Sequence, residues 1–384
     1  MAIRIRLYYL YVGLLSLLGG CNNATPHSII FDDIVTVNLS ELEELSINDL
    51  CSDITLLPLE TSQQSLLGYV EKIELTDDYI FIYDANKRLT IFDYNGKFIS
   101  KSKPIGRGPT EFHTITHFCI NHDNNYVLIY DGTQSKIKIY DGINNWKYIS
   151  ERKLPSALDA TELLFLEDGK ILANLRLSPE TNSYYEIIDI NNLSSNNELL
   201  NYPFRWTISS AISSGPKMSK TDDGLYLVSL MSDTIYMCKQ SNIYPKFYFN
   251  SGMKSIYEVD FNPQLEDYAS LYQLCYPNND ITTGVDCIIN TEYMGYTRTL
   301  IDKERYHIFW DLYSGNGCKI IARPSKDIVS NLHLYTATKD AFVGVLYPYE
   351  ISKEQLCDDR FAALHNVNED DNPILVFYKV EQYE

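Results

Sequence analysis

Hydrophobic and polar residues alternate in short runs along most of this chain, and Asp, Asn and Gly separate the runs. Residues 79–101 read YIFIYDANKRLTIFDYNGKFISK, in which two runs rich in Ile, Phe and Tyr are joined by a polar segment. A third run follows Asn95-Gly96, a dipeptide typical of tight hairpins because the central residues of such turns take positive φ. The pattern predicts antiparallel strands joined by short turns.

The same pattern returns 47 residues later, because Tyr79–Asp84 (YIFIYD) aligns with Tyr126–Asp131 (YVLIYD). Further strand pairs are expected within 170–190, 224–239, 293–313 and 341–380. A period of this size with hairpins predicts a repeat architecture, since one unit cannot bury both faces of its own sheet. We therefore expect an all-β fold, a six-bladed β-propeller over residues 51–384. A β-sandwich is the alternative, but it would not produce the period.

A propeller must close its ring. The strand pattern at 54–60 or the one at 28–39 is expected to join the blade that ends with residues 373–380, so that both ends of the domain share a sheet. Residues 265–276 (LEDYASLYQLCY) are the best helical candidate, and we expect them to form an insertion between blades.

Residues 1–20 combine a short basic segment with an apolar stretch of signal-peptide length. Leu18-Gly19-Gly20-Cys21 follows and resembles the end of a bacterial lipoprotein signal, which implies cleavage before Cys21 and lipidation of that residue. Residues 21–50 are polar and mixed, and we interpret them as a tether. An ordinary secretory signal with an incidental cysteine is the alternative.

Composition adds two constraints. The net charge of −19 repels phosphate backbones, so nucleic acid is excluded as an expected partner. Tyr outnumbers Phe by 31 to 15, which favours strands. The chain has eight cysteines but no CxxC motif, and Cys119 and Cys238 are expected to be small core residues.

The segments PLETSQQSLLGYVEKIELTDDYIFIYD, IFDYNGKFISK and IGRGPTEF together resemble the six-bladed β-propeller lipoproteins of Bacteroidetes, which are similar in shape to NHL-repeat propellers. The resemblance covers residues 54–142, and Thr110 replaces a glycine of the family pattern. It implies a propeller anchored by lipid to the outer membrane. The absence of acidic residues directly after Cys21 favours an orientation towards the periplasm. The resemblance implies no activity, since most members have no known function.

The loop IGRGPTEFH (105–113) carries the candidate site. Pro109 removes an N–H that a phosphate-binding loop needs, and no helix follows it. The loop is expected to connect the outer strand of the first blade to the inner strand of the second. Arg107, Glu111 and His113 are the candidate ligand-binding residues. The alternative is an Arg–Glu pair that pins the loop to a neighbouring blade.

Signatures of common enzymes, including GxSxG, HExxH and GxxxxGK, do not occur in the sequence. Spacings of four and five residues do not place His113, His117 and His122 on one face of a strand, so no metal site is predicted from them. Lys72, Arg88 and Lys97 are expected to be charges on strand surfaces.

These observations favour a binding or scaffold protein of the cell envelope that recognises a glycan, a peptide or a partner protein at one face through inter-blade loops and tyrosine stacking. No cofactor is predicted, and membrane contact is expected through the lipid anchor only. The alternative function is a hydrolase or lyase with a divalent metal ion in the central channel, with ligands drawn from several blades. A structural subunit of an outer-membrane complex is a third hypothesis.

Overall fold

The computed structural model divides the chain into two compact units, Met1–Asp32 and Asp33–Glu384. The structure describes residues 34–154, 158–175, 183–201, 215–229, 231–239, 242–255, 258, 280–301, 304–321, 332–351 and 359–381, all of which belong to the second unit. The expected signal peptide, Cys21 and the helical candidate at 265–276 lie outside the described residues.

The domain contains six sheets, each built on four antiparallel strands, and we number these four-stranded units as blades in chain order. In two of the sheets a fifth strand is added in parallel at the outer edge. Blade 1 comprises β4 (Val70–Leu75), β5 (Tyr79–Asp84), β6 (Leu89–Asp93) and β7 (Phe98–Lys101). Blade 2 comprises β8 (His117–Asn121), β9 (Tyr126–Asp131), β10 (Lys136–Asp141) and β11 (Lys147–Lys153). Blade 3 comprises β12 (Ala160–Phe165), β13 (Lys170–Leu175), β14 (Ser183–Asp189) and β15 (Ser194–Asn201).

The second half of the ring repeats this arrangement. Blade 4 comprises β16 (Met218–Thr221), β17 (Gly224–Val228), β18 (Thr234–Lys239) and β19 (Asn242–Asn250). Blade 5 comprises β22 (Ile289–Asn290), β23 (Met294–Ile301), β24 (Glu304–Asp311) and β25 (Gly317–Ile321). Blade 6 comprises β26 (Leu334–Ala337), β27 (Ala341–Leu346), β28 (Ile374–Lys379) and β3 (Asp53–Pro58). A short parallel pair, β20 (Lys254–Ser255) and β21 (Ile281–Thr282), lies between blades 4 and 5 in the sequence.

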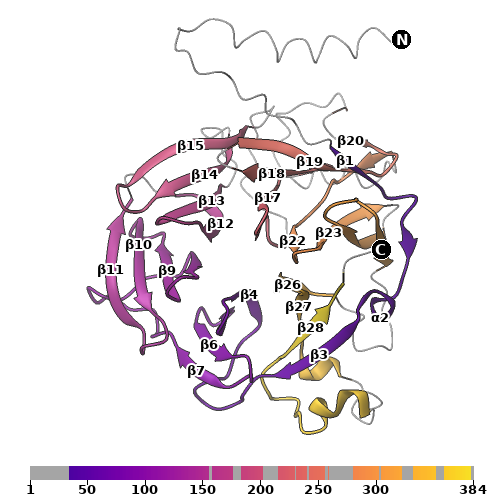
Figure 1. The fold of residues 1–384 in the computed structure, drawn as a ribbon. Helices are drawn as coiled ribbons and strands as arrows, with labels where there is room; N and C mark the ends of the chain where they lie inside the picture. Colours follow the sequence, from indigo (N-terminus) through magenta and orange to yellow (C-terminus); the bar gives the residue numbers. More distant parts are fainter. Residues whose placement is uncertain are drawn as a thin grey trace, which may run out of the picture. The chain divides into compact units, whose positions relative to one another are not determined.

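The blades are arranged as a ring, with the first strand of each nearest the centre (Figure 1). The prediction of a six-bladed propeller is confirmed, and Tyr79–Asp84 and Tyr126–Asp131 are the equivalent second strands β5 and β9 of consecutive blades. All six innermost strands begin at the same face of the ring, because each blade is a four-stranded meander. We call this face the loop face, and we call the opposite face, where innermost and second strands are joined, the turn face.

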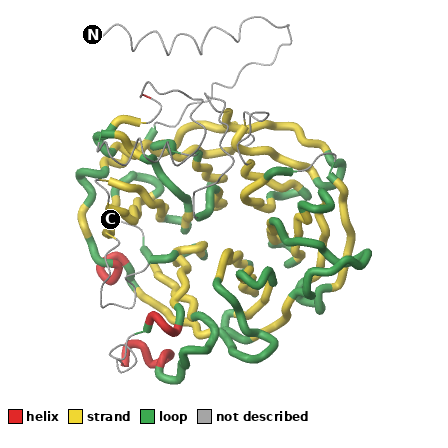
Figure 2. Tube along the Cα trace, turned by 180° about the vertical axis from the view of Figure 1, so that it is seen from behind, coloured by secondary structure: helices red, strands yellow, loops and turns green. Residues whose placement is uncertain are grey.

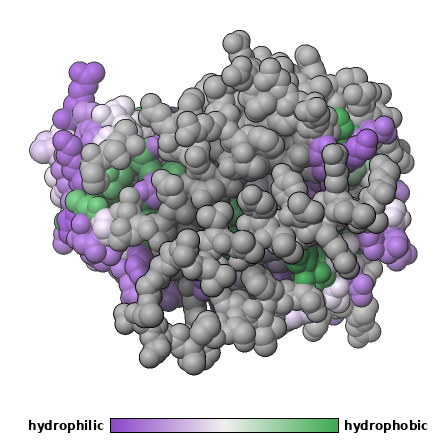
Figure 3. Space-filling model, turned by 90° about the horizontal axis from the view of Figure 1, so that it is seen from above, coloured by the Kyte–Doolittle hydropathy of each residue, from purple (hydrophilic) through white to green (hydrophobic). Residues whose placement is uncertain are grey.

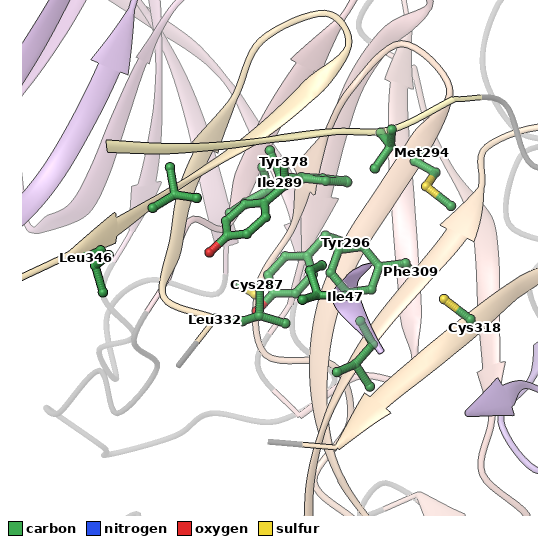
Figure 4. Packing of buried hydrophobic residues seen from close by; sticks show 14 of the residues in the cluster. Ile47, Cys287, Ile289, Met294, Tyr296, Phe309, Cys318, Leu332, Leu346 and Tyr378 are labelled. Atoms are coloured by element: carbon green, nitrogen blue, oxygen red, sulfur yellow. The ribbon is translucent and has the colours of Figure 1, made fainter. Parts of the chain in front are cut away.

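Hydrophobic packing holds neighbouring blades together. Each hydrophobic cluster of the described residues lies between two adjacent blades, so the core is distributed around the ring. Figure 4 shows the cluster between blades 5 and 6, where Tyr296 and Phe309 pack with ring centroids 5.0 Å apart. Cys119 and Cys238 are buried in the core, as predicted. Burial against two neighbours is what a lone blade could not achieve.

The N-terminal segment of the described chain runs along the outer edges of three blades. β1 (Val35–Asn38) pairs in parallel with β19 of blade 4, and β2 (Glu43–Glu44) pairs in parallel with β25 of blade 5. β3 then pairs with β28, which confirms that the two ends of the domain share a sheet. Of the two candidate strand patterns, the one at 54–60 closes the ring, whereas residues 35–38 of the other join blade 4.

The expected tether therefore differs from the structure in its second half. Ile47, in helix α2 (Ile47–Leu50), is buried in the cluster between blades 5 and 6. Ser46 caps this helix through a reciprocal pair of contacts with Asp49, so the turn is locally encoded. The segment looks polar in sequence because strands at the edge of a sheet expose one side to solvent. The folded domain therefore begins before residue 51.

Helical structure is sparse. Besides α2, the structure describes two 3₁₀ turns in the connection between β27 and β28, η2 (Pro348–Glu350) and η4 (Asp359–Leu364). These short elements lie outside the ring of strands (Figure 2). None of the helices described is both long and apolar enough to cross a membrane. The coloured part of the surface in Figure 3 is largely hydrophilic with smaller hydrophobic areas, in keeping with the charge of −19.

Ring closure gives the first prediction. Truncation after residue 371 removes β28, which pairs with β27 on one side and with β3 on the other. We expect the truncated domain to lose cooperative thermal unfolding, because the ring then has two open edges. Circular dichroism melting would measure this. Truncation after residue 380, which keeps β28, should melt like the full chain, and a cooperative transition in the shorter variant would contradict the closure.

Candidate functional site

The loop between β7 and β8 closes on itself through Glu111. The Glu111 carboxylate accepts a hydrogen bond from the N–H of Gly108 at 2.7 Å, and the N–H of Glu111 donates to the Gly108 carbonyl at 3.0 Å. A Cβ on Gly106 would lie 2.0 Å from the Glu111 carboxylate, and one on Gly108 would lie 3.0 Å from it. The two glycines therefore leave room for this carboxylate, which explains their presence beside it.

The same loop is fixed to blade 2. Lys138 of β10, which is buried, donates from Nζ to the carbonyl of Glu111, and the Tyr140 hydroxyl donates to the carbonyl of Thr110 at 3.0 Å. The loop is thus pinned to the neighbouring blade, but not by the Arg–Glu pair that the alternative named. Lys138 and Tyr140 make these contacts, and no ion pair between Arg107 and Glu111 occurs among the described residues.

The three predicted site residues are near one another in sequence but take different positions. Arg107 is exposed, whereas Glu111 and His113 are half-buried. The backbone N–H of His113 donates to the Asp131 carboxylate at 2.7 Å. None of the three lines the central cavity. Their role in ligand binding stays a prediction, and it concerns the loop face and not the channel.

A cavity of about 1530 Å³ follows the innermost strands through the centre of the ring. Its wall includes residues of β4, β8, β12, β16, β22 and β26, so every blade contributes. Charged side chains of neighbouring blades meet along this wall and bond to one another's backbone.

Lys72 and Glu74, both on β4, tie blade 1 to blade 2. Their side chains form an ion pair with Nζ and Oε1 2.5 Å apart. Lys72 Nζ donates to the Phe118 carbonyl at 3.0 Å, and Glu74 accepts from the Ile120 N–H at 3.0 Å. The prediction that Lys72 is a charge on a strand surface is wrong, because β4 is the innermost strand and Lys72 lies in the channel wall.

Glu162 and Lys217 make a similar connection further around the ring. Glu162 accepts from the backbone N–H of Lys217 at 2.7 Å, and Lys217 Nζ donates to the carbonyl of Asp286. The Asp286 carboxylate in turn lies 2.7 Å from Arg298 Nη2 of blade 5. Blades 3, 4 and 5 are therefore linked through charged groups at the channel.

The channel wall changes the proton affinity of these groups. Burial raises the pKa of the Glu162 carboxyl and lowers the pKa of the Lys217 ammonium, because both charged forms lose hydration. Burial also acts to lower the pKa of Lys72, but the carboxylates of Glu74 and Glu162 outweigh it and raise this pKa. The lining thus alternates in charge and offers hydrogen-bond donors and acceptors to a polar ligand.

Two of the three histidines within residues 113–122, His117 and His122, line the cavity. His117 Nε2 lies 2.7 Å from the carbonyl oxygen of Ala160, which links blade 2 to blade 3. Within the described ranges, no three His, Cys, Asp or Glu side chains are grouped so that they could hold a metal ion.

A stack of three tyrosines lies at the loop face. Tyr347, directly after β27, has Tyr69 on one side with ring centroids 5.2 Å apart and Tyr349 on the other at 5.4 Å. The planes differ by 11° and 16°, so the rings are nearly parallel. Tyr69 is 53% exposed and Tyr349 is 67% exposed. Tyr69 also lines the cavity, which places the stack at the mouth of the channel.

The backbone of β4 holds this stack in place. The Val70 N–H donates to the Tyr347 hydroxyl at 2.8 Å, and the Tyr335 hydroxyl donates to the Val70 carbonyl at 3.0 Å. Glu71, which lines the cavity as Tyr69 does, forms an ion pair with Lys87 at 2.6 Å. The central ring of the stack, Tyr347, is therefore anchored to β4 through its hydroxyl group.

Sequence reasoning missed these tyrosines. The sequence did offer a signal for two of them, because Tyr347-Pro348-Tyr349 follows directly after the strand pattern at 341–346. Aromatic residues in a connection between strands do not contribute to the sheet, so they indicate another role. Tyr69 carries no such signal, since only the closed ring brings it beside Tyr347 from blade 6.

The chain belongs to the family described as a domain of unknown function (DUF4934), which it matches over residues 33–379. A Bacteroides fragilis protein whose name describes it as exported has a similar structure, with a TM-score of 0.71, 21% identity and coverage of 91% of this chain and 100% of that one. A DUF4221 member from Bacteroides vulgatus has a TM-score of 0.56, 13% identity and coverage of 86% and 97% respectively. No curated protein matches the chain. Both structural similarities support the propeller fold.

The loop geometry predicts different effects for its two charged residues. Glu111→Ala removes the hydrogen bond to the Gly108 N–H and should lower the free energy of unfolding by about 1 kcal/mol. Arg107→Ala should leave stability unchanged, because Arg107 is exposed. Urea titration of both variants would measure this, and equal destabilisation would contradict the assigned role of Glu111.

Proposed function

We propose that this protein is a binding module of the cell envelope that recognises a glycan at the loop face of its propeller. The observation that carries the proposal is the exposed stack of Tyr69, Tyr347 and Tyr349 at the mouth of the channel. Monomeric proteins expose single aromatic residues routinely, whereas a fixed stack of three is a feature of binding surfaces.

The chemistry of the stack favours a sugar among the three ligand classes that the sequence left open. An aromatic ring has an electron-rich face, and the C–H groups along one side of a pyranose ring pack well against it. The hydroxyl groups at the edge of the sugar need hydrogen-bond partners, and we assign this role to the ion pair of Lys87 and Glu71, because Glu71 lines the same cavity as Tyr69. Because the Val70 N–H already fixes the hydroxyl of the central Tyr347, this side chain loses little entropy on binding.

The loop of residues 105–113 borders the same face. Arg107 is free to reach a ligand there, and Glu111 and His113 contribute by holding the loop in place. A peptide or partner protein would use the same surface differently, through the exposed aliphatic side chains Leu66 and Ile105.

The proposal includes export and lipid anchoring at Cys21, with the propeller in the periplasm. It is supported by the sequence of residues 1–21 and by the exported protein of similar structure. Cys21→Ser should abolish metabolic labelling with a fatty acid and release the protein from the membrane fraction. Protease added to intact cells should leave the wild-type protein uncut, and its degradation there would place the propeller outside the cell instead.

Tyrosine variants test the binding role. Purified wild-type protein would be screened against a panel of neutral and acidic oligosaccharides, and hits would be measured by calorimetry. Tyr69→Ala and Tyr349→Ala should each weaken binding at least about tenfold, as expected of exposed aromatic anchors.

Tyr313→Ala is the matched control, since Tyr313 is 59% exposed in the turn between β24 and β25 at the opposite face. It should bind like the wild type. A loss of binding in this variant, or sugar binding that survives both substitutions in the stack, would contradict the proposal. Binding of unstructured peptides and not of sugars would correct the ligand class.

A further inference from the structure

The turn face carries a second, chemically different feature. Six short turns join the innermost strand of each blade to its second strand, and all of them meet at this mouth of the channel. They carry the carboxylates of Asp77, Asp78, Asp123, Glu167, Asp168, Asp222, Asp223, Glu292 and Asp340. Within these six turns, all of which the structure describes, Lys339 is the single lysine or arginine.

Lys339 lies among carboxylates from other blades. Its Nζ is 3.4 Å from the Glu292 carboxylate of blade 5 and 3.8 Å from the Asp222 carboxylate of blade 4. Hydrogen bonding to Glu292 and the charges of Asp222 and Glu292 raise the pKa of Lys339. These residues and Asp77 all line the cavity, so the ammonium lies at its mouth.

The contacts of Lys339 are easy to exchange. The Lys339 side chain is 73% exposed and the Asp222 side chain is 83% exposed. Ion pairs between such exposed groups contribute little to stability. Another ammonium group could therefore replace that of Lys339 between the same two carboxylates without disturbing the fold.

An independent observation points to a ligand at this place. Asn290 is 6% exposed and lines the cavity two residues before Glu292. Its backbone N–H donates to Ser219 Oγ at 3.0 Å, but neither its side-chain nitrogen nor its side-chain oxygen has a hydrogen-bond partner. Buried amides are nearly always paired, because an unpaired one loses its hydration without compensation. Turn formation does not require this amide, whereas a ligand at the mouth would satisfy it.

We infer that the turn face binds a ligand bearing a primary ammonium group, which displaces Lys339 between Asp222 and Glu292 and bonds to the Asn290 amide through a neighbouring polar group. The ammonium belongs either to a free polyamine or to a lysine side chain of a peptide. This site lies at the opposite mouth from the tyrosine stack and does not depend on the glycan proposal.

Because the ligand must displace Lys339, removal of the charge of Lys339 should strengthen binding, whereas removal of the carboxylates should weaken it. Spermidine and trilysine serve as the probes, titrated by calorimetry into the full domain at low salt. Lys339→Met keeps the length of the side chain but removes its charge, so it should bind the probe about fivefold or more tighter than the wild type. Glu292→Gln and Asp222→Asn should each weaken binding about tenfold, and Asn290→Ala should weaken it without a change in salt dependence.

Asp370→Asn is the matched control, because Asp370 is exposed in the connection between β27 and β28 and its substitution changes the charge equally. It should bind like the wild type, and melting curves should show every variant folded. Binding of trilysine without spermidine identifies the peptide source and supports the site. Equal affinity of Lys339→Met and wild type, or equal weakening by Asp370→Asn and Glu292→Gln, would overturn it. Absence of binding to both probes would also overturn it.

Discussion

The pairing of β3 with β28 is the interaction on which the rest of this structure depends. Six consecutive residue pairs, from Asp53↔Lys379 to Pro58↔Ile374, join chain segments that are more than 300 residues apart. Without this pairing, blades 6 and 1 would have no fixed relation, and the cluster between them would be open to water. The segment that closes the ring also covers the outer edges of blades 4 and 5 with β1 and β2, which removes two strand edges from solvent.

Ring closure creates the central channel, and the innermost strand of each blade then has one edge that faces this channel. That edge has no neighbouring strand, so its N–H and C=O groups need other partners. Charged side chains of the preceding blade supply them, since Lys72 donates to the Phe118 carbonyl and Glu162 accepts from the Lys217 N–H. The buried charges are therefore paired with backbone dipoles as well as with each other, which offsets part of their lost hydration.

The sequence predicted the parts of the fold that repeat locally. Second strands such as β5 and β9 are buried on both faces, so their hydrophobic runs recur with the period of the blades. Innermost strands are harder to recognise, because β4 (VEKIEL) mixes core residues with the charges of the channel wall, and Lys72 was misplaced for this reason. The expected site loop was correctly placed between blades. Its chemistry was not predictable, since the contact of Glu111 with Gly108 depends on backbone geometry, and the tyrosine stack depends on ring closure.

The two faces of the ring differ because their connections differ. The turns between innermost and second strands are short, and short turns select Asp and Asn for local reasons, since these side chains bond to nearby N–H groups. Repetition around a ring gathers those residues at one mouth, so part of the acidic character there is a by-product of turn chemistry. Turn chemistry does not account for a lysine held among the carboxylates or for the unpaired amide of Asn290. At the loop face the connections are longer, which frees residues such as Tyr69 and Tyr349 from the sheets and makes an aromatic surface available.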